Sequence, residues 1–523
     1  MKKKLILTIS ILASFIFSIS QPAFAEKTTA SSEAQTANKT DSFSFAIDSD
    51  PLSLNPINAN DRWGLTHVNL VFSPLARVMG DGTIKNELAE KILPAEDGLS
   101  VEVTLKSGLT WSDGQPLTAE DVLFTYETKI AKENGASDTL WIGEKAIKVE
   151  KIDEQKVKFT LPEVDAAMLD QVAADTYIIP KHVYENVEDM SKAQLDVPPV
   201  GSGPYKFVEY KKGEYLKYEA NDSYYGGQPK EKNILLQIIS NPDTAKVALQ
   251  KGEVDAGLIQ PADVKSMKKK ELNIYSYSEN RVGYMGVNGN SKKLKDKKVR
   301  QAMFYALNKP KMNKATYLNK DYYANAYSIL PPNNKFYDKK VMKYKYSTKK
   351  AKKLVKEADA EGTKLKLGYM TGDKIQKLQV NLIKESLEEV GFKVELSAVE
   401  TAALVAEMQK PKTTKYDMYI SGYIWGNDPD AYKSQFKSDG DFNIMHYKNP
   451  KVDELFTKGS SELDTAKRKD IYNELQETIM EDAVFYPIVD NKKILAVNDS
   501  VKELDEENFA PVYIMADWSK IAK

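Results

Sequence analysis

The chain has 523 residues, of which 42% are hydrophobic and 28% are charged, and it contains no cysteine. A chain of this length exceeds what one hydrophobic core can serve, so we expect two or three subdomains of a soluble globular protein. Its 74 basic residues are balanced by 75 acidic ones, which argues against a nucleic-acid partner, and the lack of cysteine excludes disulfides and thiolate metal sites.

The N-terminus has the pattern of an export signal. Three lysines at 2–4 precede an apolar run from Leu5 to about Ile19, and 23–25 (AFA) supplies a small-residue cleavage site. The run is shorter than the ~20 residues of a membrane-spanning helix, so we expect cleavage after Ala25. A lipid anchor at that point would need a cysteine, so we expect an exported protein that is not a lipoprotein. Residues 26–42 have no large apolar side chain and are expected to form a disordered tether.

The first folded elements are predicted to be strands. Apolar residues alternate with polar ones at 43–47, 101–105 and 157–161, which is typical of half-buried strands with one wet face. Between the last two, Thr118 is followed three residues later by Asp121, the spacing of a capping box. We therefore predict a helix that begins at about Ala119.

The chain after residue 200 predicts a strand entry, two core-facing helices and an α/β domain. GSGPYKF at 201–207 indicates a tight turn into a strand, without the Lys-Ser/Thr ending of a phosphate loop. Apolar positions in 299–307 and 464–480 have helical spacing, and strands and helices alternate through 365–489. The lysine runs at 268–270 and 348–353 are interpreted as solvated faces.

Catalytic and metal motifs are absent from the sequence. There is no G-x-S-x-G, H-E-x-x-H or phosphate-loop motif, and the three histidines are far apart. The pair Asp428-x-Asp430 begins like a calcium loop, but the sixth position is Lys433 and the twelfth is Asp439, so the match fails. We expect no cofactor, no metal and no catalytic residue.

Ten short motifs occur together and in one order. They are LSLNPINANDRW (52–63), SPLAR (73–77), WSDGQPLTAEDVLFT (111–125), GSGPYKF (201–207), YYGGQP (224–229), LQKGEVDAG (249–257), VRQAMFYALN (299–308), GNDPDAY (426–432), HYKNPKVDEL (446–455) and EDAVFYP (481–487). With these residues the chain, from Phe43 to its C-terminus, resembles the extracellular solute-binding proteins of peptide and nickel ABC importers.

The resemblance implies an α/β fold with two hinged lobes, the first of which carries an additional inserted subdomain. The implied ranges are 43–283 with 490–523 for the first lobe, 85–200 for its insert, 284–489 for the second lobe, and 282–288 and 483–490 for the two hinge crossings. Such a protein closes on a ligand between its lobes.

The resemblance also implies the function. We expect a monomer, periplasmic or extracellular, that captures oligopeptides and delivers them to the membrane permease of an ABC importer, without catalysis. A nickel complex, an oligosaccharide or haem is the alternative ligand, although three histidines disfavour nickel. A secreted hydrolase with paired carboxylates is the alternative class, but Asp428 and Asp430 lie too close together on one loop to flank a substrate.

The resemblance suggests ligand-binding residues on three segments. We call the segment around Asp428-Pro429-Asp430 the DPD loop. In the family's peptide binders an acid near the matching loop binds the peptide's amino terminus, and the matching position here is Trp425. The candidates, from this loop, the first-lobe loop and the hinge, are Tyr423, Trp425, Asn427, Asp428, Asp430, Arg62, Trp63 and Tyr284. For Asp428 and Asp430 the alternative is a structural role in which they cap a turn and the following helix.

Overall fold

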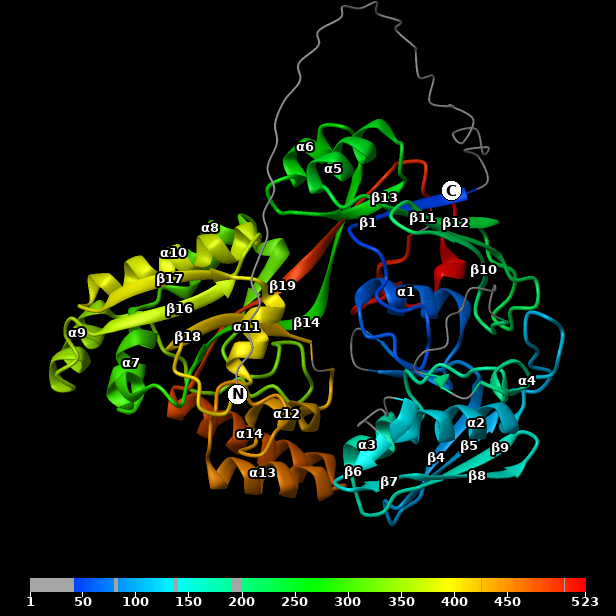
Figure 1. Cartoon of the computed structure of the whole chain (residues 1–523), viewed down its shortest axis with the longest axis horizontal. Coiled ribbons are helices and arrows are strands. Elements are labelled where there is room, and N and C mark those ends of the chain that lie inside the picture. Colours follow the sequence, from blue (N-terminus) through cyan, green and yellow to red (C-terminus); the bar gives the residue numbers. More distant parts are fainter. Residues whose placement is uncertain are drawn as a thin grey trace, which may run out of the picture. The chain divides into compact units, whose positions relative to one another are not determined.

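The computed structural model of the chain describes residues 42–79, 83–134, 140–187, 189–190, 200–424, 426–502 and 504–523. The predicted signal peptide, all of the predicted tether except Ser42, and Trp425 lie outside the described residues. Residues 41–523 form one unit, whose helices and strands are labelled in Figure 1. The fold is mixed α/β, as predicted, and its buried apolar residues gather into three main clusters.

The first core contains both ends of the folded chain, from Phe43 to Tyr277 and from Leu495 to Ile521. Its elements are β1 (Ser42–Ile47), α1 (Arg62–Val71), β10 (Tyr205–Lys211), β11 (Tyr215–Ala220), β12 (Asn233–Ile238), β13 (Ala256–Ile259), β20 (Phe509–Ala510) and β21 (Ile514–Met515). Helices α5 (Pro242–Lys251) and α6 (Val264–Lys268) contribute to smaller neighbouring clusters. Alternate residues of β1 are fully buried, as the alternating pattern predicts.

The inserted core lies within the first in sequence, between Leu75 and Ile178. The neighbouring hairpin is β2 (Ala76–Val78) with β3 (Ile84–Asn86), and the elements of the inserted core are β4 (Ala89–Pro94), β5 (Ser100–Leu105), α2 (Ala119–Ile130), β6 (Trp141–Ile142), β7 (Lys145–Ala146), β8 (Lys148–Asp153), β9 (Lys156–Thr160), α3 (Ala166–Gln171) and α4 (Lys181–Tyr184). The predicted capping box is confirmed, because Thr118 accepts from the first turn of α2 and Asp121 accepts from the amide of Thr118.

The second core extends from Val282 to Val489. Its elements are α7 (Lys297–Ala306), α8 (Lys309–Tyr317), β15 (Tyr323–Asn325), α9 (Thr348–Glu357), β16 (Lys364–Met370), α10 (Lys374–Glu389), β17 (Lys393–Val399), α11 (Thr401–Met408), β18 (Met418–Tyr423), α12 (Lys433–Phe436), α13 (Pro450–Ser461) and α14 (Thr465–Asp482). The predicted α/β character of this region and the predicted helices at 299–307 and 464–480 are confirmed.

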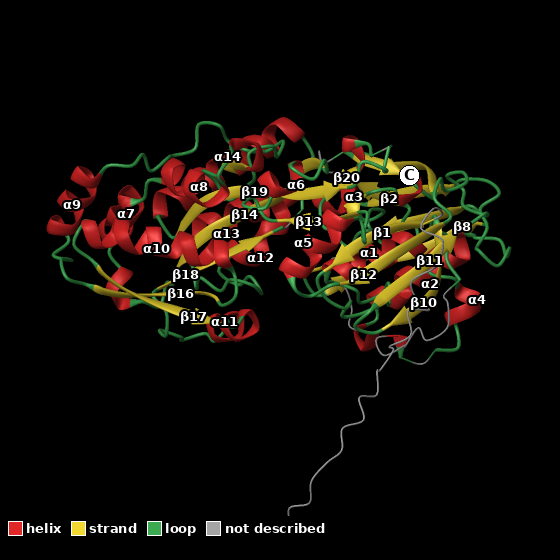
Figure 2. Cartoon of the chain, turned by 90° about the horizontal axis from the view of Figure 1, so that it is seen from above, coloured by secondary structure: helices red, strands yellow, loops and turns green. Residues whose placement is uncertain are grey.

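Two long strands, β14 (Asn273–Val287) and β19 (Phe485–Val497), belong to both the first and the second core. Within the described residues one sheet has the order β10-β11-β12-β1-β13-β19-β14-β18-β16-β17, with β15 paired to β19. Figure 2 shows β14 and β19 side by side. They are therefore the strands that connect the two cores.

The glycines of the GSGPYKF motif allow a close approach of two backbones. A Cβ on Gly203 would lie 2.6 Å from the carbonyl oxygen of Leu70, and one on Gly201 would overlap the carbonyl oxygen of Val71. Backbone atoms cannot move aside as a flexible side chain can. The motif is thus a packing contact between α1 and the start of β10.

We expect Gly203→Ala to lower the free energy of unfolding by about 2–3 kcal/mol, because overpacking against backbone forces both segments to shift. Denaturant unfolding of the purified protein measures this change. Lys212→Ala, in the exposed turn between β10 and β11, is the control and should change the value by less than about 0.5 kcal/mol. Equal stability of the Gly203 variant and wild type would refute the close-approach explanation.

Candidate functional site

The pairing of β14 with β19 is interrupted where the strands pass from the first core to the second. Register is regular up to Ser278 and resumes at Val282, which leaves 279–281 as a bulge. Asn280 within it has a φ of +56°, a left-handed conformation that asparagine tolerates better than most residues. We call residues 279–281, the adjoining parts of β14 and β19, and the loops that contact them the junction.

On the first-core side of the junction, Arg62 binds Glu279. The guanidinium donates to the two carboxylate oxygens at 2.7 and 3.0 Å and to the carbonyl oxygen of Val512 at 2.9 Å. Although burial alone would raise it, the Arg62 and Lys493 charges hold the pKa of Glu279 below its usual range. Arg62 begins α1, whose N-cap is Asp61, so this bidentate pair fastens the start of α1 to the bulge.

Three aromatic residues predicted for the site are buried among other side chains. The Trp63 indole donates to Asp48 at 2.6 Å and is 4% exposed. The Tyr284 hydroxyl accepts from Gln435 at 3.0 Å, and the Tyr423 hydroxyl donates to the carbonyl oxygen of Ile329 at 2.8 Å. In this conformation these residues support the junction through packing and bonds within the protein.

A chain of asparagines crosses the junction. The Asn280 amide donates to Asn427 at 2.9 Å, and Asn333 donates to Asn280 at 2.6 Å. Asn334 donates to the carbonyl oxygen of Asn427 at 2.8 Å, and the Asn427 amide lies 3.5 Å from the carbonyl oxygen of Met79. These hydrogen bonds connect the DPD loop to the bulge. Through Met79 they extend to the segment that follows β2.

Asp490 is a buried acid at the same place. It lies on β19, opposite Val282 of β14 and Ala324 of β15, and is 5% exposed. The Ser278 hydroxyl lies 3.1 and 3.3 Å from its two oxygens. No lysine or arginine nitrogen among the described residues lies within 4 Å of this carboxylate, and burial raises its pKa to about 6.

The two aspartates of the DPD loop already have protein partners. Arg468, on α14, donates to both oxygens of Asp428 at 2.6 and 2.8 Å, and each side chain is 4% exposed. Asp428 also caps the turn by accepting from the amide of Asp430 at 2.8 Å. Asp428 therefore has the structural role given above as the alternative, because it caps the turn.

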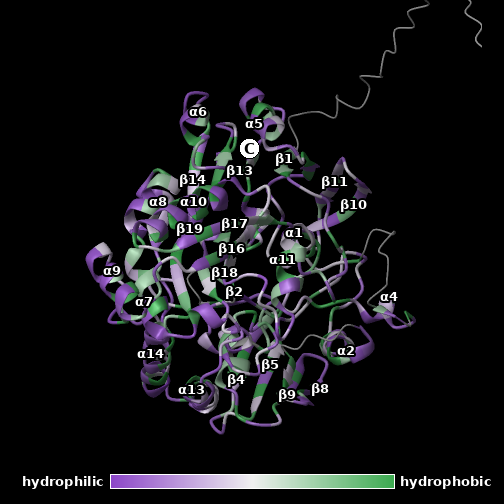
Figure 3. Cartoon of the chain, turned by 60° about the vertical axis from the view of Figure 1, so that its left-hand side comes forward, coloured by the Kyte–Doolittle hydropathy of each residue, from purple (hydrophilic) through white to green (hydrophobic). Residues whose placement is uncertain are grey.

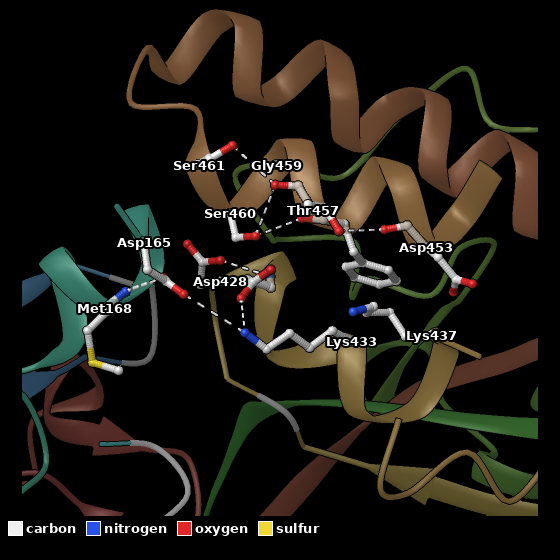
Figure 4. Close-up of polar contacts among 12 residues, drawn as sticks. Asp165, Met168, Asp428, Lys433, Lys437, Asp453, Thr457, Gly459, Ser460 and Ser461 are labelled. Carbon is white, nitrogen blue, oxygen red and sulfur yellow. Dashed lines mark hydrogen bonds and ion pairs between the residues drawn. The ribbon is translucent and has the colours of Figure 1, made fainter. Parts of the chain in front are cut away.

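Asp430 takes part in a contact between the second core and the inserted core. Lys433 lies 3.9 Å from Asp165, which caps α3 (Figure 4). The same ammonium group lies 2.7 Å from Asp430. Burial raises the pKa of Asp430, although the Lys433 charge acts in the opposite direction. The loop thus contacts the bulge through Asn427 and the inserted core through Lys433.

A separate pocket of about 870 Å³ opens in the second core, and none of the described candidate residues lines it. It lies between the ends of β14 and α14 and the segment 438–448. Arg300 and Asp482 in its wall are already paired, since Arg300 donates to the carbonyl oxygen of Asp482 and Asp482 accepts from Tyr447 and Asn449. The candidate residues converge instead on the junction.

The described residues show neither a metal cluster nor a membrane-spanning helix. No group of three or more His, Asp or Glu side chains within them could hold a metal ion. No helix in the same ranges is both long enough and apolar enough to cross a bilayer.

Sequence reasoning missed Asp490, Asn280, Asn333 and Arg468. A lone acid at the end of the apolar run AVFYPIVD carries a weak signal, and the sequence marks Asp490 only as a hinge boundary. Asn280 and Asn333 are far apart in sequence and meet only through the fold. No local pattern links Arg468 to Asp428, 40 residues away.

Comparison with known proteins identifies the class. Residues 83–443 match the model of the bacterial extracellular solute-binding proteins, family 5. The chain belongs to this family, which consists of binding proteins. Two relatives illustrate the similarity, one of them compared both by sequence and by structure.

The oligopeptide-binding protein AppA of Bacillus subtilis is 30% identical over 466 residues, 84% of each chain. The crystal structure of the ABC transporter substrate-binding protein CtaP from Listeria monocytogenes is 37% identical, with a TM-score of 0.89 over 92% of this chain and 99% of that one. The structure of AppA from B. subtilis in complex with a nonapeptide is 26% identical, with a TM-score of 0.77 over 92% and 99%.

Proposed function

We propose that the protein binds oligopeptides at the junction and delivers them to the permease of an ABC importer. The observation that carries this proposal is a set of amide side chains that is linked through the Ser278 hydroxyl to a buried carboxylate, where β14 and β19 pass between the cores. The similarity to an oligopeptide-binding protein and to a structure holding a nonapeptide supports the choice of ligand.

Amide side chains suit a ligand that is recognised through its backbone. Asparagine both donates and accepts, as a peptide group does, so Asn280, Asn333 and Asn427 can exchange their mutual bonds for bonds to a peptide. Recognition of this kind gives affinity with little dependence on side chains. The proposal therefore favours a ligand of variable sequence.

We propose Asp490 as the acid that receives the peptide's amino terminus. A free amino terminus carries a charge that must be paired once water is expelled, because an unpaired buried charge is very costly. Asp428 and Asp430 are already paired with Arg468 and Lys433. Among the described residues, Asp490 accepts a hydrogen bond only from the Ser278 hydroxyl, and the Lys492 and Arg281 charges act on its pKa without an ion pair within 4 Å.

The remaining candidates are proposed to act as follows. Asn427 contacts the peptide, Trp425 lines its path, and Arg62, Trp63, Tyr284 and Tyr423 hold the surrounding segments in place. The lobes are proposed at 43–283 with 490–523 and at 284–489, with the insert at 85–200.

We further propose that the protein acts as a monomer outside the cytoplasm, after cleavage following Ala25 and without a lipid anchor. It is proposed to bind its ligand without turnover.

Thermal melting with defined ligands tests the proposal. A mixture of peptides with free amino termini should raise the melting temperature, because a ligand that binds only the folded state stabilises it by about 2.7 kcal/mol at 100 times its Kd. The same peptides after N-acetylation should give a much smaller shift, and they should be recovered intact by mass spectrometry. A shift with only nickel, haem or an oligosaccharide would overturn the peptide assignment, and cleaved peptides would overturn binding without turnover.

A further inference from the structure

Positive charge is concentrated in one part of the second core. Residues 292–357 contain 20 Lys and Arg but only four Asp and Glu, a net charge of +16, while the rest of the chain has 54 basic and 71 acidic residues, a net charge of −17. The near-neutral total therefore conceals a strongly basic segment. It includes α7, α8 and α9.

Helix α9 presents four lysines along one side. Lys349, Lys352, Lys353 and Lys356 are exposed and have the spacing i, i+3, i+4 and i+7, which places them in one row. The opposite side, with Ala351 and Val355, is buried. We call the four residues the lysine stripe; Figure 3 shows the hydrophilic colour along α9.

The lysine stripe is almost uncompensated. Lys353 lies 3.7 Å from Glu357, and no other described carboxylate lies within 4 Å of a stripe lysine. Glu357 is itself shared with Lys298 of α7, at 3.3 Å. Like charges at these spacings destabilise a helix, so the stripe is not an arrangement that favours the isolated fold.

Two other exposed helices of the same protein alternate their charges. Lys384 pairs with Glu388 on α10, and Glu454 with Lys458 on α13, each one helical turn apart. The lysines at 265–270, on and beside the short helix α6, also make no ion pair among the described residues, but they do not lie in a segment of net charge +16. The lysine stripe combines a regular row with that local charge excess, which an anionic partner would neutralise.

Aromatic and further basic residues adjoin the stripe. Tyr346, in the segment that leads into α9, is 45% exposed, and the neighbouring Lys345 is exposed as well. This segment is held against α7, because Ser347 donates its amide to the carbonyl oxygen of Tyr305 at 2.8 Å. Tyrosine beside lysine is the combination that proteins place at the headgroup level of a bilayer.

We propose that the lysine stripe, with Lys345 and Tyr346, binds the anionic headgroups of a lipid bilayer. The lysines meet phosphate groups, and the tyrosine ring enters the interfacial layer. Such a contact holds the protein at the membrane surface without a covalent anchor. A soluble phosphate polymer offers the same charge, but it provides no interface for the exposed ring.

Vesicle sedimentation tests this surface with the mature full-length protein. The protein should bind vesicles of phosphatidylcholine mixed with phosphatidylglycerol, bind pure phosphatidylcholine vesicles weakly, and be released by added salt. The variant K349Q/K352Q/K353Q/K356Q should bind the anionic vesicles on the order of a hundredfold more weakly. Its melting temperature should not fall, because the stripe makes few bonds within the protein.

A matched variant separates this surface from total charge. K265Q/K268Q/K269Q/K270Q removes the same number of exposed lysines from and beside α6 and should leave vesicle binding nearly unchanged. Equal weakening by both variants, absence of vesicle binding, or binding of soluble polyphosphate with no preference for anionic vesicles would each overturn the proposal. Peptide binding by either variant should equal that of wild type, so this test is independent of the proposed function.

Discussion

Replacing Asp428 with alanine should lower the free energy of unfolding by about 3–5 kcal/mol. The change removes one partner of a buried ion pair and leaves the Arg468 guanidinium, 4% exposed, without its counter-charge. It also removes the N-cap of the turn that begins at Pro429. Arg468 keeps its bond to the carbonyl oxygen of Gly459, but that neutral acceptor cannot replace a carboxylate.

Denaturant unfolding of Asp428→Ala measures this loss, and two further variants make the result specific. Asp439→Ala, on an exposed side chain near Lys437, should change stability by less than about 0.5 kcal/mol. The double variant Asp428→Ala with Arg468→Met should recover part of the loss, since it removes the orphaned charge. A stable Asp428→Ala protein that no longer binds peptides would instead make Asp428 a ligand contact.

The elements that could be predicted are those determined by residues close together in the sequence. The capping box of Thr118 and Asp121, the N-cap Asp464 and the alternating strand at 43–47 involve residues two to four positions apart, so their physics is visible in the sequence. The family motifs added the α/β fold of a solute-binding protein, because ten short patterns in one order are very specific.

The site was harder to predict because its contacts join distant segments. The sequence marks the DPD loop as important, but no local pattern shows that Arg468 pairs with Asp428 or that Lys433 pairs with Asp430. Asp490 is 212 residues from Ser278, its hydroxyl partner. A carboxylate's availability to a ligand depends on such partners, and they are set by the tertiary fold.

Asp490→Asn should have opposite effects on stability and on binding. In the wild-type protein burial raises the pKa of Asp490 from an ordinary 3.8 to about 6. Ionising Asp490 at neutral pH therefore opposes folding by about 3 kcal/mol. Asparagine has the same shape, accepts from Ser278 and carries no charge. The variant should therefore be more stable than wild type at pH 7.5, by up to this amount.

The sign of the pH dependence follows from the direction of the shift. Because the folded state holds the proton more tightly, the favourable contribution of Asp490 is fully present below about pH 4 and is lost as the pH rises through about 6. The difference between Asp490→Asn and wild type should be near zero at pH 4 and largest above pH 7. Denaturant midpoints at these two pH values measure it, with the exposed Asp439→Asn as control.

Binding should change in the other direction if Asp490 meets the amino terminus of a peptide. Asp490→Asn should weaken peptides with a free amino group at least about tenfold, because a charge-assisted bond is replaced by a neutral one, and it should leave N-acetylated peptides unaffected. Titration calorimetry with both peptide forms measures the two affinities. A variant that is stabilised at pH 7.5 yet binds free-amine peptides as wild type does would make Asp490 a buried acid of the hinge alone. A gain in stability paired with a selective loss of free-amine peptides would mean that the protein retains an unfavourable buried charge because its ligand neutralises it.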